Sequence, residues 1–419
     1  MKKHFIFLCL LLNQLCITQS YAYPKPPVIT NLQQWLAQDR NLRPDLADQA
    51  FARRPLTRKQ AALATKLLLQ DQRNYIKNTW AAAWEQKEFK SGPYQFKYEY
   101  KVFGKKPQDG RSLYISLHGG GGTTAAINDQ QWRNQIKLYT PAEGIYVAPR
   151  APTNTWNMWH QDHIDVFLNQ LIQAAIVFED VNPNKVYVLG YSAGGDGVFQ
   201  LAPRMADYWA AAAMMAGHPG DATALNLRNI GFTIHMGGKD AAYKRNDLAK
   251  EWAILLDSLK QTDPKGFAHE VQIHQDRPHW MNRQDTVAIT WMAKFKRNPL
   301  PQKVVWQQDD VVKDRFYWLG VPASEAKAGR QLIATLEKNE VNILKTDYDT
   351  VLVNLNDAML NLNKPISVRW EGEEIFKGKV KRNLLLIWQS VEGRSDENLI
   401  FNAQLFLSNK KVISTALSE

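Results

Sequence analysis

The chain has 419 residues, of which 45% are hydrophobic and 22% charged, and only two of them are cysteines. This length predicts more than one folded unit, and the composition excludes wholly disordered, collagen-like and disulfide-rich proteins. The formal net charge of +11 does not indicate nucleic-acid binding, because residues 23–90, with twelve Lys or Arg against six Asp or Glu, hold +6 of it and no aromatic-interleaved basic strand is present.

Residues 1–22 have the three parts of a cleaved secretory signal: two lysines, an apolar run over 5–12, and a polar stretch ending in small residues at Ala22. The run falls short of the roughly 20 residues that span a bilayer. A membrane anchor is the alternative, but we expect cleavage after Ala22, no integral span afterwards, and a secreted or periplasmic protein. Cys9 and Cys16 both lie in this segment, so the rest of the chain has no thiol for a disulfide, a metal site or a nucleophile.

Residues 23–90 are predicted to form a helical arm. Thr57 and Gln60 make a capping-box pattern, and apolar residues recur at helical spacing over 57–88, which predicts one long amphipathic helix. We interpret the arm as packed on the main domain with its basic face solvated. A pro-segment or an attachment to an anionic envelope surface is the alternative.

Residues 91–298 alternate between strand-like and helix-like stretches, which predicts an α/β domain with a mostly parallel sheet and helices on both faces. The runs over 112–118 and 185–189 are rich in Ile, Leu and Val, as central parallel strands are. The expected strands are 96–103, 112–118, 145–148, 185–189, 209–215, 232–236 and 270–274. The expected helices are 125–138, 164–179, 193–205, 247–260 and 283–296.

From residue 299 the sequence pattern changes to short strand-like runs separated by turn residues. Glu371-Gly372 joins two such runs as a hairpin turn would. We therefore expect a small all-β accessory domain over 299–419, organised as a sandwich. Its expected strands include 303–306, 315–319, 350–354, 366–370 and 384–388.

The strongest local pattern is Gly190-Tyr191-Ser192-Ala193-Gly194, between an expected strand and an expected helix. A serine on a sharp strand-to-helix turn needs small neighbours, and the glycines provide them. This context predicts that Ser192 is a nucleophile; a plain glycine-rich turn is the alternative.

Four glycines follow His118 at the end of another expected strand. Their backbone N–H groups can turn toward a developing oxyanion, and we expect Gly120 and Gly121 to act there with Ala193, the residue after the serine. A phosphate-binding loop is the alternative, but no Walker spacing follows. His118 is expected to support the loop.

A serine nucleophile of this type needs an acid and then a histidine downstream. Asp240 directly follows an expected strand, where an open α/β sheet places functional groups, with Asp276 in reserve. His279 lies in the loop after the last expected strand of the domain, and His269 and His274 are its rivals. In the expected chemistry His279 takes the Ser192 proton, Asp240 orients the imidazole, and water hydrolyses an acyl-enzyme.

Together, HGGGG over 118–122, GYSAGG over 190–195, GGKD over 237–240 and PHW over 278–280 resemble the α/β-hydrolase superfamily. The resemblance covers about 95–297 and is nearest to secreted carboxylesterases of the phospholipase/carboxylesterase, dienelactone-hydrolase and polyester-depolymerase-like branches. It implies that Ser192, Asp240 and His279 are nucleophile, acid and base. A dienelactone hydrolase usually carries a cysteine nucleophile, so that reaction is disfavoured.

The remaining expectations concern the substrate. Trp156, Trp159 and Trp280 are candidates for lining its pocket, with packing beneath a loop as the alternative. We expect a small or polymeric ester as substrate and no metal or other cofactor, because no metal-ligand spacing occurs. A serine peptidase of the prolyl-oligopeptidase type, or a polymer- or glycan-binding protein with a vestigial hydrolase core, are the rival functions.

Overall fold

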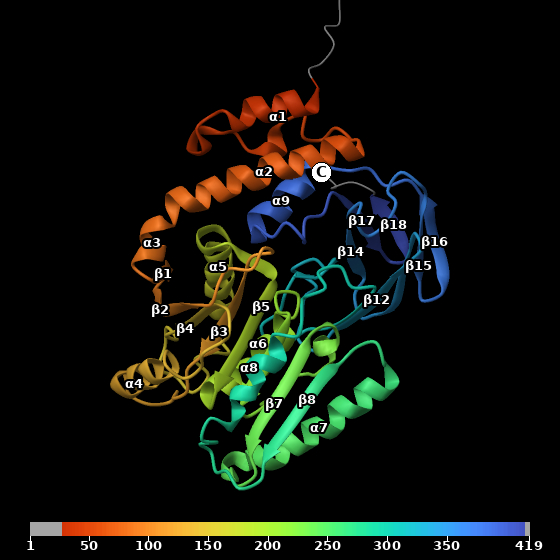
Figure 1. Cartoon of the computed structure of the whole chain (residues 1–419). Coiled ribbons are helices and arrows are strands. Elements are labelled where there is room, and N and C mark those ends of the chain that lie inside the picture. The colour runs from red at the N-terminus through yellow and green to blue at the C-terminus, as the bar shows by residue number, and fades with distance from the viewer. Residues whose placement is uncertain (1–26, 415–419) are drawn as a thin grey trace, which may run out of the picture.

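The structure is a computed structural model that describes residues 27–414, so the expected signal segment lies outside the described residues. The chain forms one eight-stranded sheet with helices around it, then two five-stranded sheets, and the N-terminal helices lie beside the C-terminal region (Figure 1). Within residues 27–414, no helix has the length and hydropathy of a membrane span.

The large sheet has the order β1-β2-β4-β3-β5-β6-β7-β8. Strands β3 to β8 run parallel to one another, β2 runs antiparallel to β4, and β1 runs antiparallel to β2. All seven expected strands of this region are present within a few residues of their predicted ends, and β1 is an additional strand at the end of the expected arm. The bounds are β1 Glu88–Ser91, β2 Tyr94–Phe103, β3 Arg111–Leu117, β4 Gly144–Pro149, β5 Val181–Tyr191, β6 Ala211–Met215, β7 Gly231–Gly237 and β8 Ala268–His274.

Helices cover both faces of this sheet, as predicted. Successive residues of a strand point to opposite faces, so Leu113 and Ile115 of β3 join the cluster that contains α5, α6 and α7, whereas Tyr114 joins the cluster that contains α8. The helices are α4 Ala125–Gln135, α5 Asp162–Glu179, α6 Ala193–Arg204, α7 Arg245–Thr262 and α8 Val287–Met292.

The expected helix over 283–296 is much shorter in the structure. Asn282 and Arg283 both have positive φ, 54° and 63°, which an α-helix does not accommodate. A 3-10 turn over Gln284–Thr286 follows, and only then does the six-residue α8 begin.

The C-terminal region contains two five-stranded sheets whose alternate side chains are buried in one hydrophobic cluster, as in a sandwich. The Glu371-Gly372 hairpin turn is confirmed: both residues have positive φ, as a two-residue I′ turn requires. The expected strand over 315–319 is instead two short paired strands, β10 and β11. The bounds are β9 Lys303–Gln307, β10 Arg315–Phe316, β11 Leu319–Gly320, β12 Gln331–Glu337, β13 Glu340–Thr346, β14 Thr350–Leu355, β15 Ile366–Trp370, β16 Glu373–Gly378, β17 Ala403–Ser408 and β18 Lys411–Ser414.

The prediction of a strand over 384–388 is wrong, because this segment begins helix α9, Leu384–Arg394. The Asn383 side chain caps it by accepting the Leu385 N–H at 2.7 Å. Leu384, Ile387 and Val391 are buried at helical spacing. A short apolar run does not by itself distinguish a strand from a buried helix, and here the cap and a helical partner decide for the helix.

The arm is less regular than predicted. Its helices are α1 Val28–Leu36, α2 Arg58–Thr79 and α3 Ala81–Glu85. The capping box is confirmed, with Thr57 and Gln60 each accepting the other's backbone N–H. The single helix expected over 57–88 breaks at Trp80, and Lys87, with φ 55°, turns the chain into β1.

The arm packs chiefly on α9 rather than on the large sheet. Leu32 of α1, Leu68 of α2 and Ile387 of α9 belong to one buried cluster, and Trp35 meets Trp388 edge to face with ring centroids 5.8 Å apart. Part of the basic charge of the arm is paired within the protein rather than solvated: the guanidinium groups of Arg40 and Arg43 lie 3.1 and 2.8 Å from Asp71.

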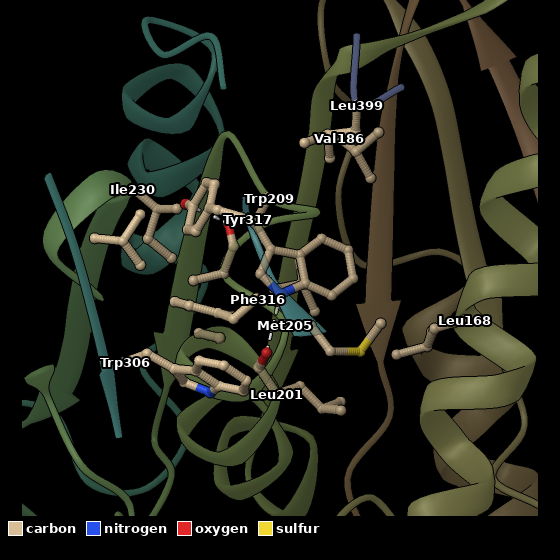
Figure 2. Packing of buried hydrophobic residues seen from close by; sticks show 14 of the residues in the cluster. Leu168, Val186, Leu201, Met205, Trp209, Ile230, Trp306, Phe316, Tyr317 and Leu399 are labelled. Atoms are coloured by element: carbon tan, nitrogen blue, oxygen red, sulfur yellow. Dashed lines mark hydrogen bonds between the residues drawn. The ribbon is translucent and has the colours of Figure 1, made fainter. Parts of the chain in front are cut away.

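The hydrophobic core continues from the large sheet into the C-terminal region. Figure 2 shows Phe316 and Tyr317, which follow the predicted boundary, beside Trp209 and Met205 of the α/β region. The Tyr317 hydroxyl donates to the Ala206 carbonyl at 2.9 Å, with both groups buried. The two regions are therefore joined by a buried interface.

The cluster between the arm and α9 predicts that the arm contributes to stability. Leu68→Ala removes a fully buried side chain and should lower the free energy of unfolding by about 2–4 kcal/mol. Leu63→Ala in the same helix removes a side chain that is 42% exposed and should change it by about 0.5 kcal/mol or less. Urea denaturation followed by tryptophan fluorescence measures both, and equal effects would contradict the packing role.

Candidate active site

Ser192 occupies a sharp turn between β5 and α6. Its backbone has φ 58° and ψ −124°, a conformation that non-glycine residues rarely adopt and that costs about 1–3 kcal/mol. The Ser192 N–H donates to the Met215 carbonyl and the Asp196 N–H donates to the Ser192 carbonyl, both at 2.9 Å. These bonds hold the strained turn at the carboxyl end of the central strand.

The glycines around Ser192 allow the strand and the helix to approach closely. A Cβ atom on Gly190 would lie 2.2 Å from the Gly194 carbonyl oxygen, and one on Gly194 would lie 2.1 Å from the Leu117 carbonyl oxygen. Any larger residue at either position would force α6 away from β5 or β3. The sequence requirement for small neighbours is therefore a steric one.

The structure brings Ser192, His279 and Asp240 together. His279 Nε2 lies 3.0 Å from Ser192 Oγ, and its Nδ1 lies 2.6 Å from Asp240 Oδ2. The Asp240 side chain is almost fully buried, whereas that of His279 is 41% exposed at the edge of a pocket. This order of atoms allows a proton to pass from the hydroxyl to an imidazole that a carboxylate orients.

Close contact between two loops sets this geometry. Asp240 follows β7 and His279 follows β8, and a Cβ on Gly237 would lie only 2.2 Å from the Pro278 carbonyl oxygen. The Lys239 N–H donates to the Arg277 carbonyl at 2.9 Å. Gly237 thus lets the loop that bears the carboxylate lie directly against the loop that bears the imidazole.

The rival candidates are engaged elsewhere. Asp276 is exposed and faces Lys239 at 3.8 Å. His269 lies 3.1 Å from Asp257, and His274 Nε2 lies 3.4 Å from the Nδ1 of another strand histidine. None of the three is bonded to Ser192, so His279 and Asp240 are the partners that the geometry favours.

The glycine loop after β3 provides one side of the site. Gly119 and Gly120 border the same pocket as Ser192, and Ala193, as the first residue of α6, has no intrahelical acceptor for its N–H. Gly121 does not fit the expected oxyanion role, because its N–H donates to Asn128 Oδ1 at 2.8 Å. Gly120 and Ala193 remain the candidate donors.

Two buried side chains hold this glycine loop. His118 Nδ1 donates to the Gly119 carbonyl at 2.6 Å and its Nε2 accepts the Ala151 N–H at 3.2 Å. Burial lowers the pKa of His118 to about 3, so the imidazole is neutral in this role. Asn128, also fully buried, lies so close to Gly120 that a Cβ there would be 2.2 Å from its Oδ1. Sequence reasoning missed Asn128, which no motif marks.

Tyr191 ties the serine strand to the histidine loop. Its hydroxyl donates to the His279 carbonyl at 2.6 Å and accepts the Met281 N–H at 3.0 Å. Burial raises the pKa of Tyr191, which keeps the hydroxyl protonated. The residue before the nucleophile thus fixes the backbone on both sides of Trp280, a contact between distant loops that the sequence does not reveal.

The pocket beside Ser192 has a volume of about 740 Å³. Of the three expected tryptophans only Trp280 lines it. Trp159 does not, because it is fully buried beneath the glycine loop, where its indole N–H donates to the His118 carbonyl at 2.9 Å. Trp156 lies outside this pocket, 70% exposed, with its backbone against Gly121.

No cluster of three or more potential metal-binding side chains exists within residues 27–414.

The buried histidines predict a loss of stability in mild acid. Burial lowers the pKa of both His118 and His235 to about 3. The unfolded chain takes up protons as the pH falls through about 6.5, whereas the folded chain does not. Stability is therefore full above pH 6.5 and declines below it, by about 4 kcal/mol at pH 5 for the two groups.

Urea denaturation at pH 7 and pH 5 measures this decline. His118→Asn keeps a side-chain N–H donor but removes one titrating group, so it should reduce the decline between pH 7 and pH 5 by about 2 kcal/mol. An unchanged pH dependence in that variant would show that His118 is protonated in the folded protein.

Comparison with solved structures finds similar proteins with low sequence identity. A thermostable esterase is 18% identical over 50% of this chain, with a TM-score of 0.39, and the match covers only 62% of that chain. A carboxylesterase from Bacillus cereus is 16% identical over 53% of this chain and 98% of its own, with a TM-score of 0.35. A feruloyl esterase module from Clostridium thermocellum is 14% identical over 50% of this chain and 86% of its own, with a TM-score of 0.36.

No protein-family model matches the chain, and no curated protein matches it significantly. Because all three TM-scores lie below 0.5, the fold is defined by the features of the chain itself and not by these similarities. A mostly parallel eight-stranded sheet carries Ser192 on a strained strand-to-helix turn, with helices on both faces. The core of this chain has the α/β-hydrolase fold, and a β-rich C-terminal region is attached to it.

Proposed function

We propose that this protein is a serine hydrolase that cleaves carboxylic esters. The observation that carries the proposal is the continuous chain of contacts from Ser192 Oγ through His279 to Asp240, at 3.0 and 2.6 Å. Hydrogen bonds of this length connect a nucleophile, a general base and an orienting acid in the same order as in a Ser–His–Asp triad. The candidate oxyanion donors stand beside the serine, where acyl transfer needs them.

In the proposed mechanism His279 takes the proton of Ser192 as the oxygen attacks the ester carbonyl. The oxyanion that forms accepts hydrogen bonds from the N–H groups of Gly120 and Ala193, which together contribute about 3–4 kcal/mol or more. Collapse expels the alcohol, to which His279 returns the proton, and leaves an acyl-enzyme on Ser192. Water then attacks with His279 as base, releasing the acid and restoring the hydroxyl.

We further propose that the protein is exported and acts outside the cytoplasm. The basic, apolar and small-residue parts of residues 1–22 support this proposal. Sequencing the N-terminus of protein recovered from the medium and from the periplasm tests both cleavage and location. An intact Met1 in the mature protein would contradict it.

Replacing the nucleophile is the direct test of the mechanism. Ser192→Ala should lower turnover of p-nitrophenyl butyrate by about 10⁴-fold or more, because no oxygen remains to form the acyl-enzyme. A fluorophosphonate probe should label the wild type and not the variant. Circular dichroism serves as the control for folding, and retained turnover in a folded variant would overturn the assignment of Ser192.

Positioning of the histidine loop by the Tyr191 hydroxyl predicts an effect on kcat. Tyr191→Phe removes both hydrogen bonds to the histidine loop and should lower kcat about tenfold or more with little change in KM, because the imidazole is less well placed. Tyr187→Phe is the matched control on the same strand, since its hydroxyl donates at 2.8 Å to the Phe295 carbonyl, away from His279. Similar kinetics for the two variants would contradict a positioning role for Tyr191.

The choice between ester and peptide substrates is tested by measuring the hydrolysis of both substrate classes with one enzyme preparation. We expect p-nitrophenyl esters to be hydrolysed and aminoacyl p-nitroanilides to be left intact. A preference for the anilides would replace the esterase proposal with a peptidase. If the protein shows no turnover and is not labelled by the fluorophosphonate, a binding protein is the better explanation.

A further inference from the structure

The pocket beside Ser192 has an uneven distribution of charge. The described residues that line it include two cations, Lys137 and Arg283, and three side-chain amides, but no Asp or Glu. The amides are Gln131, Asn134 and Gln135, from α4. The apolar part of the wall comes from Leu138, Tyr191 and Trp280. A ligand that fills this pocket therefore meets an apolar surface and positive charge together.

The two cations come from different loops that meet at the wall of this pocket. Lys137 follows the end of α4, and Arg283 stands four residues after His279. The Arg283 guanidinium donates to the Lys137 carbonyl at 3.4 Å. Within residues 27–414, neither side chain lies within salt-bridge distance of an acidic residue. Burial raises the pKa of Asp285, two residues from Arg283, and the charge of Arg283 acts to lower it.

The end of α4 explains only part of this arrangement. Cations are stabilised near the last carbonyls of a helix, and Arg283 donates one N–H group to the Lys137 carbonyl, two residues beyond the end of α4. A guanidinium has five N–H donors and an ammonium has three. Most of the hydrogen-bonding capacity of the pair therefore remains available to a group in the pocket.

We propose that the substrate is an ester that carries a second, free carboxylate, and that Lys137 and Arg283 bind this carboxylate. The inference rests on the proposed function and adds the substrate class. A carboxylate accepts hydrogen bonds from both cations, and a pocket without acidic residues does not repel it. The carbon skeleton of the substrate lies against Leu138 and Trp280, while its ester carbonyl reaches Ser192.

Matched ester pairs test the proposal. The p-nitrophenyl monoester of adipic acid has the carboxylate on the acyl part, and its methyl ester is the neutral counterpart. The pair 4-acetoxybenzoate and methyl 4-acetoxybenzoate has it on the part that leaves. For the wild type, kcat/KM should be about tenfold higher for the anionic member of at least one pair, chiefly through KM, and this preference should shrink in 0.5 M salt.

Substitutions then assign the preference to the two cations. The double variant Lys137→Gln with Arg283→Gln keeps polar side chains and should lower the anionic-to-neutral ratio of kcat/KM by about tenfold, and each single variant by two- to fivefold. Lys377→Gln on β16 removes the same charge from the C-terminal sandwich and should leave the ratio unchanged.

The outcomes separate this inference from the proposed function. Hydrolysis of the neutral esters with no anionic preference in either pair would overturn the inference and leave the esterase standing. A preference that persists in the double variant would also overturn it. If no ester of either pair is hydrolysed, the proposed function fails. Calorimetry with monomethyl adipate then decides the inference separately. The inference stands if this ligand binds Ser192→Ala but not the double variant, and any other result overturns it.

Discussion

The close approach of β5 and α6 at Ser192 is the constraint on which the rest of the site depends. A non-glycine residue is held at φ 58° because Gly190 and Gly194 leave no side chain between the strand and the helix. The strain lifts the serine hydroxyl clear of the sheet, at the point where the central parallel strands end. It also places the first free N–H of α6 directly beside that hydroxyl.

The other groups reach the serine because they leave the same edge of the sheet. β3, β7 and β8 run parallel to β5, so the glycine loop, Asp240 and His279 all emerge beside Ser192. Contacts between the loops then set the distances. Gly237 brings the carboxylate loop against Pro278, and Tyr191 fastens the backbone of His279. The geometry depends on backbone contacts as much as on the three side chains.

The parts of the fold that could be predicted are those with a local cause. The alternation of apolar strands and helices predicted the large sheet, and the motif around Ser192 combined with chain order led to Asp240 and His279. What failed depends on long-range packing. Leu384 begins a helix because a helical arm over 300 residues earlier in the chain covers it. Trp159 is buried because its indole N–H meets a carbonyl of the glycine loop. The oxyanion expectation for Gly121 failed because Asn128 accepts its N–H.

Among residues 27–414, those that line the pocket beside Ser192 all fall between 119 and 283, so the described part of the C-terminal sandwich does not contribute to that wall. Buried charge pairs instead join the sandwich region to the core: Arg297 lies 2.6 Å from Asp396, and Arg394 pairs with Asp207. Such pairs add little net stability, but a shift between the two regions that broke them without admitting water would leave buried charges unpaired. Because α9 carries both Arg394 and the surface that binds the arm, the arm, the sandwich and the hydrolase core form one framework. If the proposed function holds, substrate selection belongs to the loops of the core, and the two flanking regions support that core.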